Sequence, residues 1–132
     1  MTEFNLDEPK GVWFDMEGGG RIQLRVHTVE SMKQLEKQVS ENKVEYKRID
    51  GRAERFQFKK TDEDLQSELF WDWVIVSWEK FFDVQLKPIE CNKTNKLLLV
   101  KRSTKFIKFV NESLEQLQND ETEHAEATEK NS

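Results

Sequence analysis

The chain has one cysteine, Cys91, and only two histidines among its 132 residues. A single cysteine cannot form an intramolecular disulfide, and the few Cys and His side chains do not have the spacing of a zinc site. No hydrophobic run approaches the length needed to span a bilayer. Residues 1–10 contain three acidic side chains and lack the apolar segment of a signal peptide. We therefore expect a cytoplasmic protein that uses no membrane, metal or cofactor.

Hydrophobic residues are also few, at 36%, while charged residues reach the same 36%. The apolar side chains are nevertheless large, because nine Phe and four Trp are among them. Aromatic side chains of this size each bury a large area when they pack. Length and composition together predict a small single domain over residues 1–118, with a compact core and a heavily charged surface.

Residues 119–132 differ from the rest of the chain in composition. They contain five acidic side chains and one lysine, and so carry four of the five net negative charges. They contain no large apolar side chain whose burial could offset the entropy lost on ordering. We predict a disordered acidic tail here and a nearly neutral body before it.

Two hairpins are predicted in the first half of the chain. Apolar and polar residues alternate over residues 12–16 and 21–27 around the glycines 18–20, which places His27 at the outer face of a strand end. These glycines suit a turn rather than a phosphate-binding loop, since a strand and not a helix follows them. The second hairpin, over residues 43–60, turns at Asp50-Gly51. Between the two, Thr28 can cap a helix that begins at Val29.

The second half of the chain is predicted to be helical. Thr61 and Asp64 have the spacing of a capping box, and the apolar run after them favours a buried helix that ends near Phe81. Residues 74–76 alone could also form a strand. A short helix is expected to start at Asn92 or Thr94, and a last one at Ser103. The predicted class is α+β, with N-terminal antiparallel β-hairpins and a helical C-terminal half.

No set of side chains has the pattern of a catalytic site. The one conceivable Cys–His pair is Cys91 with His27, because His124 falls in the predicted tail. Both residues have simpler interpretations, Cys91 as a small half-buried side chain and His27 as the end of a strand. We expect a protein that is not an enzyme.

Basic residues gather in two places, over residues 43–60 and 93–108. Aromatic side chains are interleaved with the first cluster, as in some nucleic-acid-binding ribbons. No acidic residue interrupts the second, and such stripes can bind phosphates. A small nucleic-acid-binding or regulatory protein is therefore the alternative function. The nearly neutral body and the acidic tail argue against nucleic acid and leave an acidic protein as the favoured partner of these patches.

The aromatic residues around position 75 exceed what one helix face needs for packing. Trp73 and Trp78 are predicted to lie in the core, whereas Phe81 and Phe82 suit either the core or an interface. The residues selected for partner binding combine these aromatic side chains with nearby cations. They are Trp71, Phe81, Phe82, Lys96, Arg102 and Lys105.

A resemblance to a known family rests on short motifs spread over residues 8–117. The motifs are EPKGVWF at 8–14, RIQLR at 21–25, VSWE at 76–79, Pro88-Ile89, NKLLL at 95–99 and FIKFV at 106–110. Their order resembles that of the small tail assembly chaperones encoded beside the tape-measure gene in long-tailed bacteriophages and prophages. Similar sequences often have glycine after the Trp-Glu step and before the Pro-Ile step, where this chain has Lys80 and Lys87.

The resemblance implies a function in phage or prophage tail assembly in the cytoplasm of the bacterial host. The protein would bind the tape-measure protein, or other tail proteins, and keep this long helical partner soluble while tail subunits polymerise around it. The family pattern supplies no catalytic residues. Binding by such a chaperone would use exposed aromatic and aliphatic side chains.

Overall fold

The computed structural model describes residues 1–4 and 6–130, with side chains described as far as Asn119. Within these residues the chain is a small α+β domain with four helices and antiparallel hairpin sheets. The predicted class is confirmed. Contacts divide the chain into two compact units, unit 1 with Met1–Val26 and Trp71–Ser132, and unit 2 with His27–Phe70.

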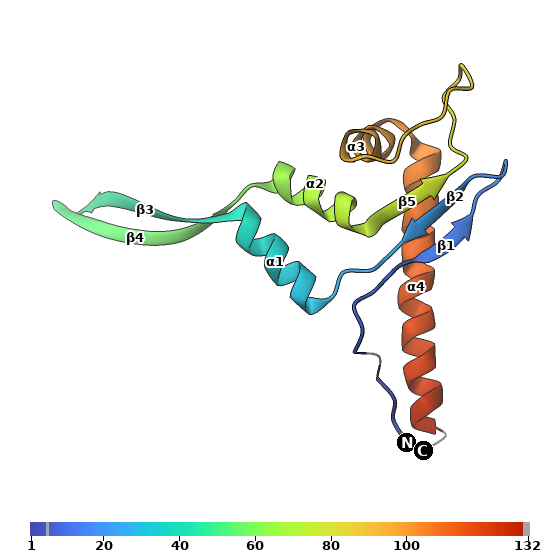
Figure 1. Cartoon of the computed structure of the whole chain (residues 1–132). Helices are drawn as coiled ribbons and strands as arrows, with labels where there is room; N and C mark the ends of the chain where they lie inside the picture. The colour runs from blue at the N-terminus through green and yellow to red at the C-terminus, as the bar shows by residue number, and fades with distance from the viewer. Residues whose placement is uncertain (5, 131–132) are drawn as a thin grey trace. The chain divides into compact units, whose positions relative to one another are not determined.

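Unit 1 is built on an antiparallel sheet in the order β1-β2-β5, with strands β1 (Val12–Asp15), β2 (Arg21–Leu24) and β5 (Ile75–Glu79). Figure 1 shows these strands side by side. The predicted glycine turn joins β1 to β2, and Met16 N donates to Gly20 O over 2.7 Å. Gly18 and Gly19 have positive φ angles, which glycine adopts without strain.

Helices α3 (Lys93–Arg102) and α4 (Thr104–Lys130) complete unit 1. Asn92, one of the two predicted starts, caps α3 by accepting from Asn95 N at 2.9 Å. Ser103 Oγ accepts from Phe106 N at 3.1 Å and so caps α4. Helix α4 packs against α3 and against β2. The hydrophobic side chains buried in this unit are Ile22, Leu24, Val74, Ile75, Trp78, Phe106 and Val110.

The prediction of one helix up to Phe81 is wrong. Helix α2 (Glu63–Val74) ends at Val74, and β5 begins directly with Ile75. The alternative of a strand around residues 74–76 was nearer the observed structure. The strand forms because β2 offers an edge, on which Leu24 pairs with Ile75 and Ile22 with Trp78. Tertiary pairing here overrides the helical pattern.

The start of α2 also differs from the prediction. Asp62 Oδ1, and not Thr61, accepts from Leu65 N at 3.1 Å. Thr61 is instead the last residue of the preceding strand, where it pairs with Ser40. Aspartate is among the most favourable capping residues, and its charge suits the positive end of the helix dipole.

Unit 2 contains α1 (Val29–Val39), β3 (Ser40–Ile49), β4 (Arg52–Thr61) and the beginning of α2. The predicted cap of α1 is confirmed, since Thr28 Oγ1 accepts from Ser31 N at 3.1 Å and Ser31 Oγ accepts from Thr28 N at 2.8 Å. The predicted turn is confirmed too. Asp50 and Gly51 both have positive φ, as a tight type I′ turn requires.

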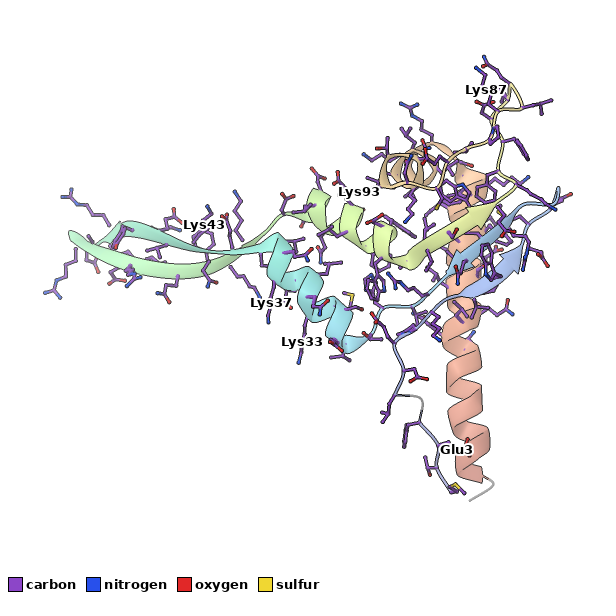
Figure 2. All side chains as sticks on the ribbon, in the orientation of Figure 1. Glu3, Lys33, Lys37, Lys43, Lys87 and Lys93 are labelled. Carbon is purple, nitrogen blue, oxygen red and sulfur yellow. The ribbon has the colours of Figure 1, made fainter. Side chains whose placement is uncertain are left out.

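Strands β3 and β4 form a ribbon of ten antiparallel pairs, from Ser40↔Thr61 to Ile49↔Arg52. Apart from half-buried Ser40, every side chain of the ribbon is exposed. Figure 2 shows side chains along both faces, with Lys43 labelled. Large apolar side chains are among the exposed ones, including Val44, Tyr46, Phe56 and Phe58. The ribbon therefore contributes no residue to the hydrophobic core.

The predicted tail falls mostly outside the described residues, because side chains are described only as far as Asn119. Its disorder stays a prediction. In the described part of the chain, no helix is long and apolar enough to cross a membrane.

Candidate partner-binding site

The loop that follows β5, residues 82–88, is held in one conformation by Asp83. Its carboxylate accepts hydrogen bonds from Gln85 N at 2.8 Å and from Lys87 N at 3.0 Å. The backbone closes the loop as well, since Asp83 N donates to Lys87 O and Ile89 N donates to Phe81 O. A β-bridge joins Phe82 to Pro88. We call this segment the apolar loop.

Three hydrophobic side chains of the apolar loop are exposed to solvent. The exposed fractions are 52% for Phe82, 100% for Val84 and 82% for Leu86. Figure 2 labels Lys87, which lies in the same loop. An ordered loop that displays several apolar side chains is typical of a binding surface, because little entropy is lost when it meets a partner.

The backbone is strained at two positions, one just before the apolar loop and one within it. Lys80 has φ of 57° and Leu86 has φ of 62°, in the left-handed region that favours glycine. Non-glycine residues held in this region cost about 1–3 kcal/mol each and occur often at functional sites. The contacts of Asp83 stabilise this arrangement.

Three aromatic rings form a packed cluster beside the loop. Trp78 stacks on Phe81 with ring centroids 5.1 Å apart, and Phe106 meets both rings edge to face. Trp78 is 6% exposed, and its Nε1 donates to Ile89 O over 2.7 Å. The prediction that Trp78 lies in the core is confirmed. Trp73 is half-buried.

A pocket of about 320 Å³ opens next to this cluster. Its walls come from the β1–β2 turn, the segment that follows β5, helix α3 and the start of α4, and include Gly20, Phe81, Phe82, Ile89 and Lys105. Gly20 must be small, since a Cβ there would lie 2.9 Å from the Phe81 ring.

The structure places the six predicted partner-binding residues in different surroundings. Phe81, Phe82 and Lys105 line the pocket. Arg102 is exposed in the last turn of α3, and Trp71 is half-buried in α2, and neither is among the pocket residues.

Lys96, the sixth, is only 8% exposed. Its Nζ lies 3.2 Å from both the carbonyl oxygen and Oδ1 of Asp72. This cation therefore neutralises Asp72 near the C-terminal end of α2 and offers little surface to a partner. We leave it out of the proposed binding site.

Sequence reasoning missed Asp83, Val84, Leu86 and Gly20 as parts of this site. A signal was present, because Phe82, Val84 and Leu86 alternate with polar residues ahead of Pro88. An aspartate at the start of such a segment often caps a turn. The close approach of Gly20 to Phe81 has no signal in the sequence, since it depends on the fold.

Arg25 follows β2 directly and is half-buried. Its Nε donates to Trp73 O over 2.8 Å, and its guanidinium lies 3.5 Å from the centre of the Trp73 ring. Burial lowers the pKa of Arg25 from its usual value, while Glu8 and Asp72 act in the opposite direction. Arg25 thus supplies a cation at the C-terminal end of α2, which has no basic residue in its own last turn.

Cys91 and His27 have separate local environments, in unit 1 and unit 2 respectively. Burial raises the pKa of the Cys91 thiol, which makes its thiolate scarcer at neutral pH. His27 follows β2 and is not part of a strand, so that prediction is wrong. Its Nδ1 lies 3.0 Å from Ser31 Oγ, and its ring stacks on Phe70.

Among the described side chains, no group of three or more His, Cys, Asp and Glu residues could hold a metal ion. Comparison with protein-family models, with curated proteins and with solved structures finds no match.

Proposed function

We propose that the protein is a tail assembly chaperone of a phage or prophage, which binds the tape-measure protein in the cytoplasm of the bacterial host. The observation that carries this proposal is the apolar loop, which displays Phe82, Val84 and Leu86 next to a pocket lined by Phe81. A helical partner with apolar residues on one face could place one of them in the pocket and cover the loop with others.

The backbone adds support for the resemblance. Related sequences often have glycine after the Trp-Glu step, and here Lys80 adopts a left-handed φ at that position. The second glycine of the pattern falls at Lys87, next to Leu86, which is also left-handed. Lys80 therefore has the backbone conformation that glycine would allow, whereas Lys87 does not have a positive φ.

The proposal can be tested by co-expression with the cognate tape-measure protein. We expect the wild-type protein to raise the soluble yield of the tape-measure protein, and Phe82→Asp or Val84→Asp to remove that effect. Both side chains are exposed, so the fold should persist. Circular dichroism checks this.

The matched control is Val29→Asp, at an exposed apolar residue that begins α1 in unit 2. An acidic residue suits a helix N-terminus, so this variant should fold and keep the solubilising effect. If the wild-type protein leaves tape-measure solubility unchanged, the chaperone function is wrong. If both loop variants still solubilise it, only the choice of surface is wrong.

The ribbon supports nucleic-acid binding as a second candidate. The strand register puts Arg48, Arg55 and Lys59 on one face, which contains Tyr46 and no acidic residue. Phosphate binding there would weaken steeply with salt and would be lost in Arg48→Glu/Arg55→Glu. We expect only weak, non-specific binding to oligonucleotides near physiological salt. Tight, salt-dependent binding that this variant abolishes would favour the second candidate.

A further inference from the structure

Strand β3 has an open edge in the described part of the chain, where it pairs with β4 alone. The turn at Asp50-Gly51 makes Ile49 and Arg52 a hydrogen-bonded pair. Every second residue from Ile49 therefore directs its N–H and C=O toward β4. The residues between them direct these groups to the open edge, and Asn42, Val44 and Tyr46 are at its centre.

Charges of opposite sign alternate along one face of β3. Glu41, Lys43, Glu45 and Lys47 occupy successive positions on this face. Their common orientation is visible in the ion pair between Lys43 Nζ and Glu41 Oε2, at 3.0 Å. All four side chains are exposed. The order of the signs makes this strand complementary to a second copy of itself that runs in the opposite direction.

We propose that β3 pairs with β3 of a second copy of the chain, antiparallel and about a twofold axis at Val44. In this register Glu41 faces Lys47 of the second copy, and Lys43 faces its Glu45. The twofold axis repeats both pairs, which gives four opposite-charge contacts. They fall at the non-hydrogen-bonded positions, where side chains of neighbouring strands are closest. The two ribbons become one four-stranded sheet.

Two neighbouring registers of the same edge are disfavoured by charge, and a twofold axis at Asn42 or at Tyr46 would keep only two of the four opposite-charge contacts. A twofold axis at Lys43 or at Glu45 would place each of these residues opposite its own copy and align like charges on both sides. Pairing of two copies through the free edge of β4 is also disfavoured. An axis at Gln57 would bring Phe56 and Phe58 together, but it would set Arg55 opposite Lys59.

The need for such a partner follows from the ribbon itself. A two-stranded ribbon without a packed face is marginally stable in water, whereas three or more strands with an apolar face are much more stable. Charged side chains commonly protect an edge strand from pairing. Charges of one sign would repel the same strand of a second copy. The alternating signs on β3 instead allow an antiparallel second copy to place opposite charges next to each other.

Charge reversal tests the proposal by sedimentation velocity over about 1 µM to about 1 mM protein, where mass action shifts a dimer equilibrium. The wild-type chain is expected to dimerise. Glu41→Lys/Glu45→Lys gives an edge of four lysines, and Lys43→Glu/Lys47→Glu gives four glutamates, so each should be monomeric. An equimolar mixture of the two should form heterodimers. A variant with all four charges exchanged should again form homodimers.

Backbone substitutions provide a matched pair that does not depend on charge. Val44 and Gln57 are partners in the ribbon, and each directs its N–H away from the other strand. Val44→Pro therefore removes an N–H from the open edge of β3, and Gln57→Pro removes one from the open edge of β4. Only Val44→Pro should abolish the dimer. A wild-type chain that stays monomeric at the highest concentration would overturn the proposal. Dimers that persist in Val44→Pro, or in both charge-reversal variants, would also overturn the proposal.

Discussion

The two sheets of this protein have the same hydrogen-bonding pattern and opposite relations to the core. In the β1-β2-β5 sheet, Ile22 and Leu24 are fully buried under α4 and alternate with half-buried polar residues. In the β3–β4 ribbon, Val44 and Tyr46 alternate with charged residues in a similar way and remain exposed. Alternation thus predicts a strand without indicating what covers its apolar face.

The two sheets differ in the source of their stability. Burial of apolar area in unit 1 stabilises its sheet, whereas the ribbon obtains little from its own side chains. The surfaces that remain open are the apolar loop and the ribbon, and the two proposals place partner binding there. Substitutions in the two regions should therefore differ in their effects on stability and on binding.

Trp78→Ala should lower the free energy of unfolding by about 3–5 kcal/mol, the usual cost of deleting a large buried aromatic side chain. The change also removes the stacking on Phe81 and the hydrogen bond to Ile89 O. Urea unfolding followed by tryptophan fluorescence or circular dichroism measures it. Phe56→Ala in the ribbon is the control and should cost far less at low protein concentration. Equal losses in the two variants would show that the regions do not differ as described.

Gly20→Ala should destabilise unit 1 by about 1–3 kcal/mol, because the new methyl group overlaps the Phe81 ring and forces it to move. The pocket beside Phe81 should change shape as a result. Thermal unfolding measures the loss of stability. Gly18→Ala is a comparison in the same turn, because Gly18 has positive φ and open space around it, so that variant carries backbone strain without the overlap. Unchanged stability in Gly20→Ala would argue against the close contact.

Asp83→Ala should affect binding more than stability. The substitution removes the acceptor for Gln85 N and Lys87 N, which water can replace at this exposed site. We expect a loss of about 1 kcal/mol or less in unfolding free energy. The loop should become more mobile, and the solubilising effect on the tape-measure protein should fall. Full retention of that effect would show that the loop need not be held in this conformation.

The smallest expected effect is a pH dependence in unit 2. A hydrogen bond and ion pair with Lys59 lower the pKa of Glu36 below its usual value. A lowered pKa in the folded state adds stability above the unfolded pKa, and this contribution disappears as the pH falls through the folded pKa. Thermal unfolding between neutral and acidic pH should therefore show slightly less acid sensitivity in Glu36→Gln. An identical pH dependence in both proteins would mean that the pair contributes nothing.

Local signals predicted much of the fold. The caps at Thr28 and Asn92 and the turn at Asp50-Gly51 all depend on neighbouring residues, and all three are confirmed. The error at β5 has a different origin. Residues 75–79 continue the apolar pattern of α2, and only pairing with β2 makes them a strand.

Only part of the candidate site was predicted, because local signals mark some of its residues and tertiary packing places the others. Aromatic surplus indicated Phe81 and Phe82, which line the pocket. The sequence could not show that Lys96 forms an ion pair with Asp72, because 24 positions separate the two residues. Nor could it show the contact of Gly20 with Phe81. Such relations come from tertiary packing, which periodicity does not encode.

Hydrogen exchange of the protein, alone and in complex with the co-expressed tape-measure protein, is the measurement that decides whether the apolar loop binds the partner. At a fixed concentration of this chain, binding should slow exchange in peptides that cover residues 80–90 and leave exchange in β3 and β4 unchanged. Protection confined to the ribbon, or absent from residues 80–90, would contradict the assignment of the apolar loop as the partner-binding surface.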